Sequence, residues 1–126
     1  MKEISMTEKA TRKPYDLENR TFEFAKHVRL FTKGLKRSLS NSEDAKQVIR
    51  SSGSVGANYI EANESLSKKD FVMRIKICRK EANESAYWLQ LIGEINEDAV
   101  KEKAAILHKE ANELKKIFSA IIPKTT

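Results

Sequence analysis

A repeated carboxylate motif is the first feature of this sequence that could support chemistry. Glu-Ala-Asn-Glu occurs three times, at Glu61–Glu64, Glu81–Glu84 and Glu110–Glu113. Carboxylates that project inward from several helices of a bundle are typical of di-iron sites, which also use a histidine three residues after a glutamate. Neither His27 nor His108 has that spacing.

The apolar spacing around the motif favours a structural role for the glutamates. Ala82 and Ala111 occupy core positions in the last two repeats. The glutamates that this turns toward the helix flank or the solvent are Glu81, Glu84, Glu110 and Glu113. We therefore predict salt bridges at the helix flanks rather than a metal site, and we expect no cofactor.

Other arrangements typical of catalysis are missing from the sequence. Cys78 lies on an apolar stripe with no histidine nearby, so we predict a buried structural thiol rather than a nucleophile. The segment Gly53–Gly56 lacks the lysine and the preceding strand of a phosphate-binding loop. His27 lies on a cationic face, which favours a surface residue over a ligand or base. We predict that the chain is not an enzyme.

Two runs of basic residues indicate a binding function. The formal charge of the chain is +6, which suits an anionic partner. The members of the two runs are Lys26, Arg29, Lys33, Lys36 and Arg37, then Arg74, Lys76, Arg79 and Lys80. Such runs can contact phosphates without reading base sequence; the alternative is a solvated face that keeps the protein soluble. No aromatic stacking platform accompanies them, so shaped or double-stranded nucleic acid suits them better than single strands.

Composition and periodicity predict one all-α domain. The chain has 126 residues, of which 40% are hydrophobic and 33% charged, with two prolines and four glycines. Apolar residues at alternating spacings of three and four predict four helices. They run roughly from Leu17 to Arg37, from Glu43 to Ser65, from Phe71 to the turn before Asn96, and from there to Pro123. Short turns between them predict an antiparallel up-down four-helix bundle.

Capping residues mark the expected helix starts. Asn41 or Ser42 is expected to cap the second helix, and Asn96 the fourth. Ser67 has Asp70 three residues later, which is the spacing of a capping box for the third helix.

The sequence also predicts how the chain is divided and in which compartment it is found. We expect a flexible N-terminal arm at residues 1–15, the bundle at 16–123 and a C-terminal tail at 124–126. The first thirty residues lack a signal-peptide pattern, and no apolar run reaches the roughly 18 residues of a membrane span. We therefore expect a cytoplasmic protein without membrane contact, and the single cysteine agrees with a reducing compartment.

Apolar and small residues outside the core lines predict self-assembly. The stretch Ser51–Glu64 is dense in small residues, which allow close helix packing. The positions that we expect at an oligomer interface are Ile49, Gly53, Gly56, Ile60, Ile77, Trp88 and Leu91. A second apolar line with a tryptophan is typical of interfaces, although Trp88 can instead cover the edge of the monomer core. Asn58 is expected to act as a buried polar pin that fixes helix register.

A family resemblance adds to these inferences. It covers about Asp16 to Leu91, and its most specific positions are Ser54, Gly56, Ala57, Asn58, Tyr59, Glu61 and Ala62. On these residues the chain resembles the four-helix-bundle family of the 23S rRNA intervening-sequence proteins. The resemblance implies a left-handed bundle that assembles as a homopentamer around a central channel, with no catalytic residue. The accessory protein of diversity-generating retroelements resembles a distant relative, a basic pentamer that engages a reverse transcriptase and nucleic acid.

Two hypotheses about function remain. In the first, the chain is a non-catalytic oligomer that binds structured rRNA, or retroelement-type RNA or DNA, through its basic helix faces. In the second, it is an oligomeric scaffold or accessory subunit for a protein such as a reverse transcriptase, and its charges only keep it soluble.

Overall fold

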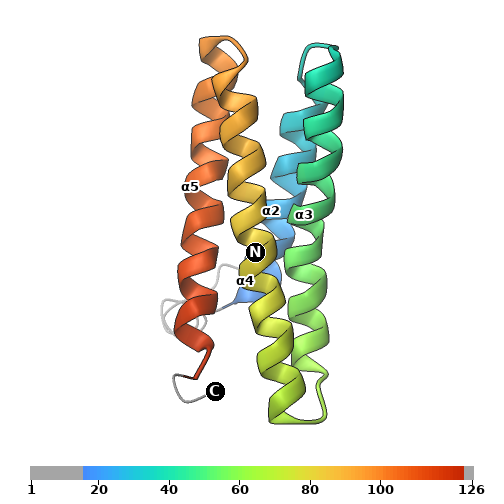
Figure 1. Cartoon of the computed structure of the whole chain (residues 1–126), viewed down its shortest axis with the longest axis vertical. Helices are drawn as coiled ribbons and strands as arrows, with labels where there is room; N and C mark the ends of the chain where they lie inside the picture. The colour runs from blue at the N-terminus through green and yellow to red at the C-terminus, as the bar shows by residue number, and fades with distance from the viewer. Residues whose placement is uncertain (1–15, 124–126) are drawn as a thin grey trace, which may run out of the picture.

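Residues 16–123 fold into four antiparallel helices. The computed structural model describes residues 16–123, which form α2 (Leu17–Lys33), α3 (Leu39–Asn63), α4 (Lys68–Glu94) and α5 (Asp98–Ile121). Figure 1 shows the helices running alternately up and down, with short connections at the two ends of the bundle. The predicted all-α up-down bundle is confirmed, whereas the predicted arm at 1–15 and tail at 124–126 lie outside the described residues.

The four helices form a ring in which α2 and α4 are diagonal. α4 packs extensively on both α3 and α5, and α2 packs on α3. The contact of α2 with α5, which closes the ring, is the smallest of the four, and α2 is also the shortest helix with 17 residues. Because α2 and α4 occupy opposite corners, their outer faces point away from each other.

The core follows the predicted apolar stripes. Its fully buried side chains include Phe24, Val28, Val48, Val55, Ile75, Cys78, Ala82, Leu89, Ile92, Ala111, Leu114 and Phe118. Tyr59 of α3 reaches across to α5, where its ring centroid lies 6.0 Å from that of Phe118. Burial of each large apolar side chain contributes about 1.5–3 kcal/mol, so this interior is the main source of stability.

α3 and α4 both begin earlier in the chain than the sequence predicts. A serine caps each of them, Ser38 at α3 and Ser67 at α4. Ser38 has an extended backbone, and its hydroxyl accepts the Asn41 N–H at 3.0 Å, so α3 begins at Leu39 rather than near Glu43. The predicted Ser67 cap is confirmed, since its hydroxyl accepts the Asp70 N–H at 3.1 Å. That helix nevertheless begins at Lys68, three residues before the expected start.

Asn41 and Asn96 join the two connections at one end of the bundle, and the prediction that they cap helices was wrong. Each side-chain amide donates to the other's oxygen, at 3.1 and 2.9 Å. Asn41 also donates to the Lys36 carbonyl, and Asn96 to the Ile92 carbonyl. Glu97 takes the N-cap position of α5, without a side-chain hydrogen bond to the helix. The two asparagines thus hold the first turn of α3 against the connection of α4 to α5.

Small residues on α3 bring it close to both of its neighbours. A Cβ atom at Gly56 would lie 2.9 Å from the buried Thr21 Oγ1 of α2, and one at Gly53 would lie 3.0 Å from the Arg29 guanidinium. On the other side, the hydroxyls of Ser51 and Ser85 meet at 2.7 Å between α3 and α4, and both side chains are fully buried. The close packing predicted for this stretch therefore occurs within a single chain.

The Gly56 contact predicts a position-specific loss of stability. Gly56→Leu should lower the free energy of unfolding by at least about 1–3 kcal/mol, because the side chain would push α2 away from α3. Ala57→Leu is the matched control, since Ala57 is the next residue on the same helix and is exposed. Thermal unfolding at one protein concentration provides the measurement. Equal stability of the two variants would show that α2 does not pack on Gly56.

Candidate nucleic-acid interface

Two of the predicted basic residues on α2 serve the fold. Lys26 lies 3.4 Å from Glu23, one turn earlier on the helix. Arg29 extends over Gly53, where its guanidinium donates to the Ala25 carbonyl at 3.1 Å and to the Ile49 carbonyl at 3.3 Å. Arg29 therefore links α2 to α3, and its hydrogen-bonding capacity is partly used before any ligand arrives.

The other three predicted cations of this run gather at the end of α2. Lys33 lies in the last turn of the helix, and Lys36 and Arg37 follow in the connection to α3. All three side chains are exposed, and none forms an ion pair within residues 16–123. We call these residues the loop-end cluster. A lysine in the last turn also interacts favourably with the helix dipole, but its ammonium group remains available to solvent.

The second predicted run divides in the same way between structure and surface. Arg74 of α4 donates to the Asn58 Oδ1 of α3 at 2.8 Å and so joins these helices. Lys76 and Lys80 are exposed and Arg79 is half-buried; of these, Lys80 lies 3.9 Å from a Glu81 carboxylate oxygen. We call Lys76, Arg79 and Lys80 the α4 cluster.

Asn58 is placed differently from the sequence prediction. It was expected inside the bundle, but it is half-buried at the edge between α3 and α4. Its amide donates to both the carbonyl and the hydroxyl of Ser54 at 2.9 Å, while its oxygen accepts from Arg74. Asn58 thus positions the Arg74 guanidinium against α3.

Arg50 is a structural residue that sequence analysis missed. Its Nη2 lies 3.2 Å from Glu81 Oε1 and 2.7 Å from Glu84 Oε2, so it binds both glutamates of the second repeat. Glu84 also accepts the Trp88 indole N–H at 2.9 Å. The salt bridges predicted for these glutamates are confirmed. Of the two predicted positions, flank or solvent, Glu81 takes the flank, where it is only 6% exposed.

Arg20 forms the corresponding pair between α2 and α5. Its Nε and Nη2 donate to the two carboxylate oxygens of Glu110 at 2.7 and 2.9 Å. The hydrogen bond to Glu110 raises the pKa of Arg20. Glu113 instead lies 3.7 Å from Lys116 on its own helix. Within residues 16–123, no three histidine, cysteine or acidic side chains are grouped as metal ligands.

The predicted interface residues lie along two different edges of the bundle. Ile49, Gly53, Gly56 and Ile60 follow the side of α3 that faces α2. There, a groove of about 220 Å³ is bordered by the exposed side chains of Phe22 and Ile60. The α4 residues of the prediction are Ile77, Trp88 and Leu91, all half-buried.

The remaining positions of the family motif are divided between the core and the surface. Ala62 is buried and Tyr59 packs against the core. Ala57 and Glu61 are exposed, and Ser54 is half-buried beside Asn58. The motif therefore combines packing against two neighbouring helices with a small exposed face.

Cys78 is confirmed as a buried thiol. Its side chain is fully buried, and its Sγ lies 3.4 Å from the Val55 carbonyl oxygen, to which it donates. Desolvation raises the pKa of this thiol to about 12. It is therefore protonated at neutral pH, in the form that is a poor nucleophile.

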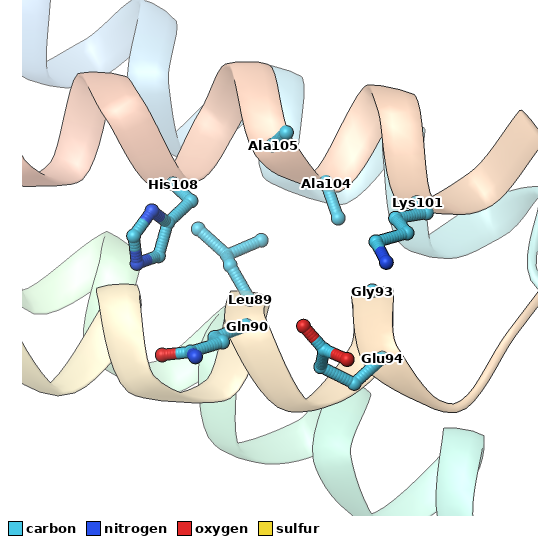
Figure 2. A pocket seen from close by; sticks show the side chains of 8 residues that line it. All are labelled: Leu89, Gln90, Gly93, Glu94, Lys101, Ala104, Ala105 and His108. Atoms are coloured by element: carbon cyan, nitrogen blue, oxygen red, sulfur yellow. The ribbon is translucent and has the colours of Figure 1, made fainter. Parts of the chain in front are cut away.

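A pocket between α4 and α5 is smaller than a typical ligand site, and its polar side chains lie far apart from one another. Its volume is about 220 Å³, whereas small-molecule sites usually span roughly 300–1,000 Å³. Figure 2 shows His108 and Gln90 at one end of the pocket and Lys101 and Glu94 at the other, with Leu89 between them. These groups do not converge on a common point, so the two cationic clusters remain the stronger candidate site.

No helix within residues 16–123 has the length and hydropathy needed to cross a bilayer.

Comparisons with known proteins identify related sequences and a related fold. The family model described as 23S rRNA-intervening sequence protein matches residues 13–120. A crystal structure of a protein of unknown function in the S23 ribosomal protein family, from Bacteroides thetaiotaomicron VPI-5482, is 31% identical and has a TM-score of 0.69. The match covers 86% of this chain and 99% of that one. No curated protein matches the chain.

The Arg50 pair predicts a pH-dependent contribution to stability. Desolvation of Glu84 opposes its ionisation, but hydrogen bonds from Trp88 and Arg50 outweigh it, and the pKa of Glu84 is lowered. Because the folded state then holds its proton less tightly than the unfolded state, this stabilisation is complete above the unfolded pKa. It is lost as the pH falls through the folded pKa.

The test compares wild type with Glu84→Gln by urea unfolding, followed through the fluorescence of Trp88, which is the single tryptophan. Wild type should be more stable at pH 7, and the difference should shrink on acidification below the usual glutamate range. Glu102→Gln is the control, because Glu102 is exposed and has no ion pair within residues 16–123. A difference that stays constant with pH would contradict the assigned role of Glu84.

Proposed function

This chain belongs to the family of 23S rRNA-intervening sequence proteins, and from that premise we propose that it is a non-catalytic oligomer that binds structured nucleic acid. The ligand is rRNA, or retroelement-type RNA or DNA, and the contacts are made by basic helix faces. The observation that supports this function most directly is the division of the cations. Arginines next to carboxylates serve the fold, whereas the loop-end and α4 clusters project from it with few or no acidic partners.

The chemistry of these clusters fits a phosphate backbone. Flexible lysines dominate both clusters, and a lysine acts as a point charge toward phosphate rather than as a reader of base edges. Binding of this kind gains free energy from the release of counterions and is weakened by salt. The clusters contain no aromatic side chain on which an unpaired base could stack, so a duplex or a folded RNA is the better partner.

Self-assembly is the second part of the proposal. The exposed Phe22 and Ile60 border the groove between α2 and α3, and they provide apolar surface for a neighbouring copy. Membership of the family supports a homopentamer. Repetition of a weak phosphate site around such a ring increases the overall affinity for one long polyanion that spans several sites.

A protein-binding scaffold is the second candidate function, and one feature of the surface favours it. At the connection of α3 to α4, Leu66 is 99% exposed and Met73 is 55% exposed. They line a pocket of about 420 Å³ together with Ile77, the carboxylates of Glu61, Glu64 and Asp70, and Arg74. Exposed apolar side chains beside three carboxylates suit a basic protein segment better than a nucleic acid, so this end of the molecule is the place for a protein partner.

The loop-end cluster provides the test of nucleic-acid binding. We expect Lys33→Gln, Lys36→Gln and Arg37→Gln, combined in one variant, to weaken binding of duplex RNA or DNA. The dependence of log affinity on log salt should become shallower by up to about 3, since each lost phosphate contact removes about one unit. Fluorescence anisotropy over a salt series measures both quantities.

The matched control removes three exposed lysines from α5, by Lys101→Gln, Lys103→Gln and Lys109→Gln. These lysines alternate with acidic residues such as Glu102 and Glu110, so their removal should change the slope little. Absence of wild-type binding at low salt would contradict the proposed function. Equal losses in the two variants would show that only net charge matters.

A further inference from the structure

The two cationic clusters belong to diagonal corners of the bundle and differ in their level along its axis. The loop-end cluster belongs to α2 and its connection to α3, while the α4 cluster belongs to the diagonal helix. Inward-facing residues fix these directions, because Phe24 and Val28 of α2 and Ile75 and Cys78 of α4 all point into the shared core. Lys33 of α2 and the exposed Lys76 and Lys80 of α4 therefore lie on helix faces that look away from each other, and α3 and α5 lie between the two helices (Figure 1). Lys36 and Arg37 lie in the connection at the end of the bundle, where Lys36 borders the connection of α4 to α5.

The clusters are also separated along the bundle axis. The Asn41 amide binds the Lys36 carbonyl, so the loop-end cluster lies level with the start of α3. The Cys78 thiol binds the Val55 carbonyl, so the α4 cluster lies level with the middle of that helix. The stretch of α3 from Asn41 to Val55 spans about 21 Å at 1.5 Å per residue. The diagonal of the bundle adds to this separation.

We propose that each protomer binds two separate nucleic-acid segments, one on the loop-end cluster and one on the α4 cluster, and so bridges them. The inference rests on the proposed function and goes further by dividing the basic surface into two sites. A duplex has a persistence length of about 150 base pairs, so a short one cannot bend around the bundle to reach Lys33 of α2 together with Lys76 and Lys80 of α4. Contact with both of these faces therefore requires two duplexes, or two helical arms of one folded RNA.

The stoichiometry of binding to a short duplex tests this directly. The probe is a blunt duplex of about 12 base pairs, roughly 40 Å long at 3.4 Å per base pair, titrated into the full chain at low salt. Wild type should saturate at two duplexes per protomer. The triple variant Lys33→Gln, Lys36→Gln and Arg37→Gln should saturate at one, and so should Lys76→Gln, Arg79→Gln and Lys80→Gln. Isothermal titration calorimetry reports the stoichiometry independently of the affinity.

The possible results distinguish a failure of the two-site inference from a failure of nucleic-acid binding itself. Saturation of wild type at one duplex per protomer, with both variants weakened at that same site, would overturn the two-site inference and leave nucleic-acid binding intact. No binding by wild type would overturn both. Five of the six substituted side chains are exposed and Arg79 is half-buried, and circular dichroism should show unchanged helix content and melting in both variants. If a variant unfolds, the single changes Lys36→Gln and Lys76→Gln replace it, with loss of affinity at one of two sites as the expected result.

Discussion

The close approach of α3 to both of its neighbours is the constraint on which the rest of the bundle depends. Gly56 admits Thr21 of α2, and the paired hydroxyls of Ser51 and Ser85 hold α3 against α4. Without side-chain bulk at these contacts, helix axes can lie near the short end of the usual range of 8–10 Å. Apolar core side chains then fill the interior, and the charged side chains lie at the edges between helices or on the surface.

Arginines and lysines take different places in this arrangement. The arginines Arg20 and Arg50 lie between helices and pair with glutamates, because a planar guanidinium can bind two carboxylate oxygens at once. The Arg20–Glu110 pair joins α2 to α5, and the pairs of Arg50 with Glu81 and Glu84 join α3 to α4. The lysines of the two clusters stay outside, where their hydration is undisturbed. A molecule built this way offers a polyanion two cationic surfaces without reorganising its core.

The helical bundle and its core stripes were predictable from sequence because they depend on local periodicity. Other features depend on residues that are distant in the chain. Asn41 and Asn96 have the composition of caps, yet 55 positions apart they meet each other instead. Glu81 was expected at the helix flank or in solvent, but its own helix cannot reveal that its partner is Arg50 of α3. Which of the predicted basic residues are free also depends on neighbours that the sequence pattern does not reveal, such as Gly53 beneath Arg29.

The mass and the nucleic-acid content of the purified particle distinguish an oligomer that binds nucleic acid from a monomer that does not. Light scattering behind a sizing column gives the mass, and the ratio of absorbance at two ultraviolet wavelengths gives the nucleic acid that accompanies the protein. We expect a multimeric particle that carries nucleic acid after purification at low salt. At high salt it should release the nucleic acid and remain multimeric. A monomer free of nucleic acid under both conditions would contradict this expectation.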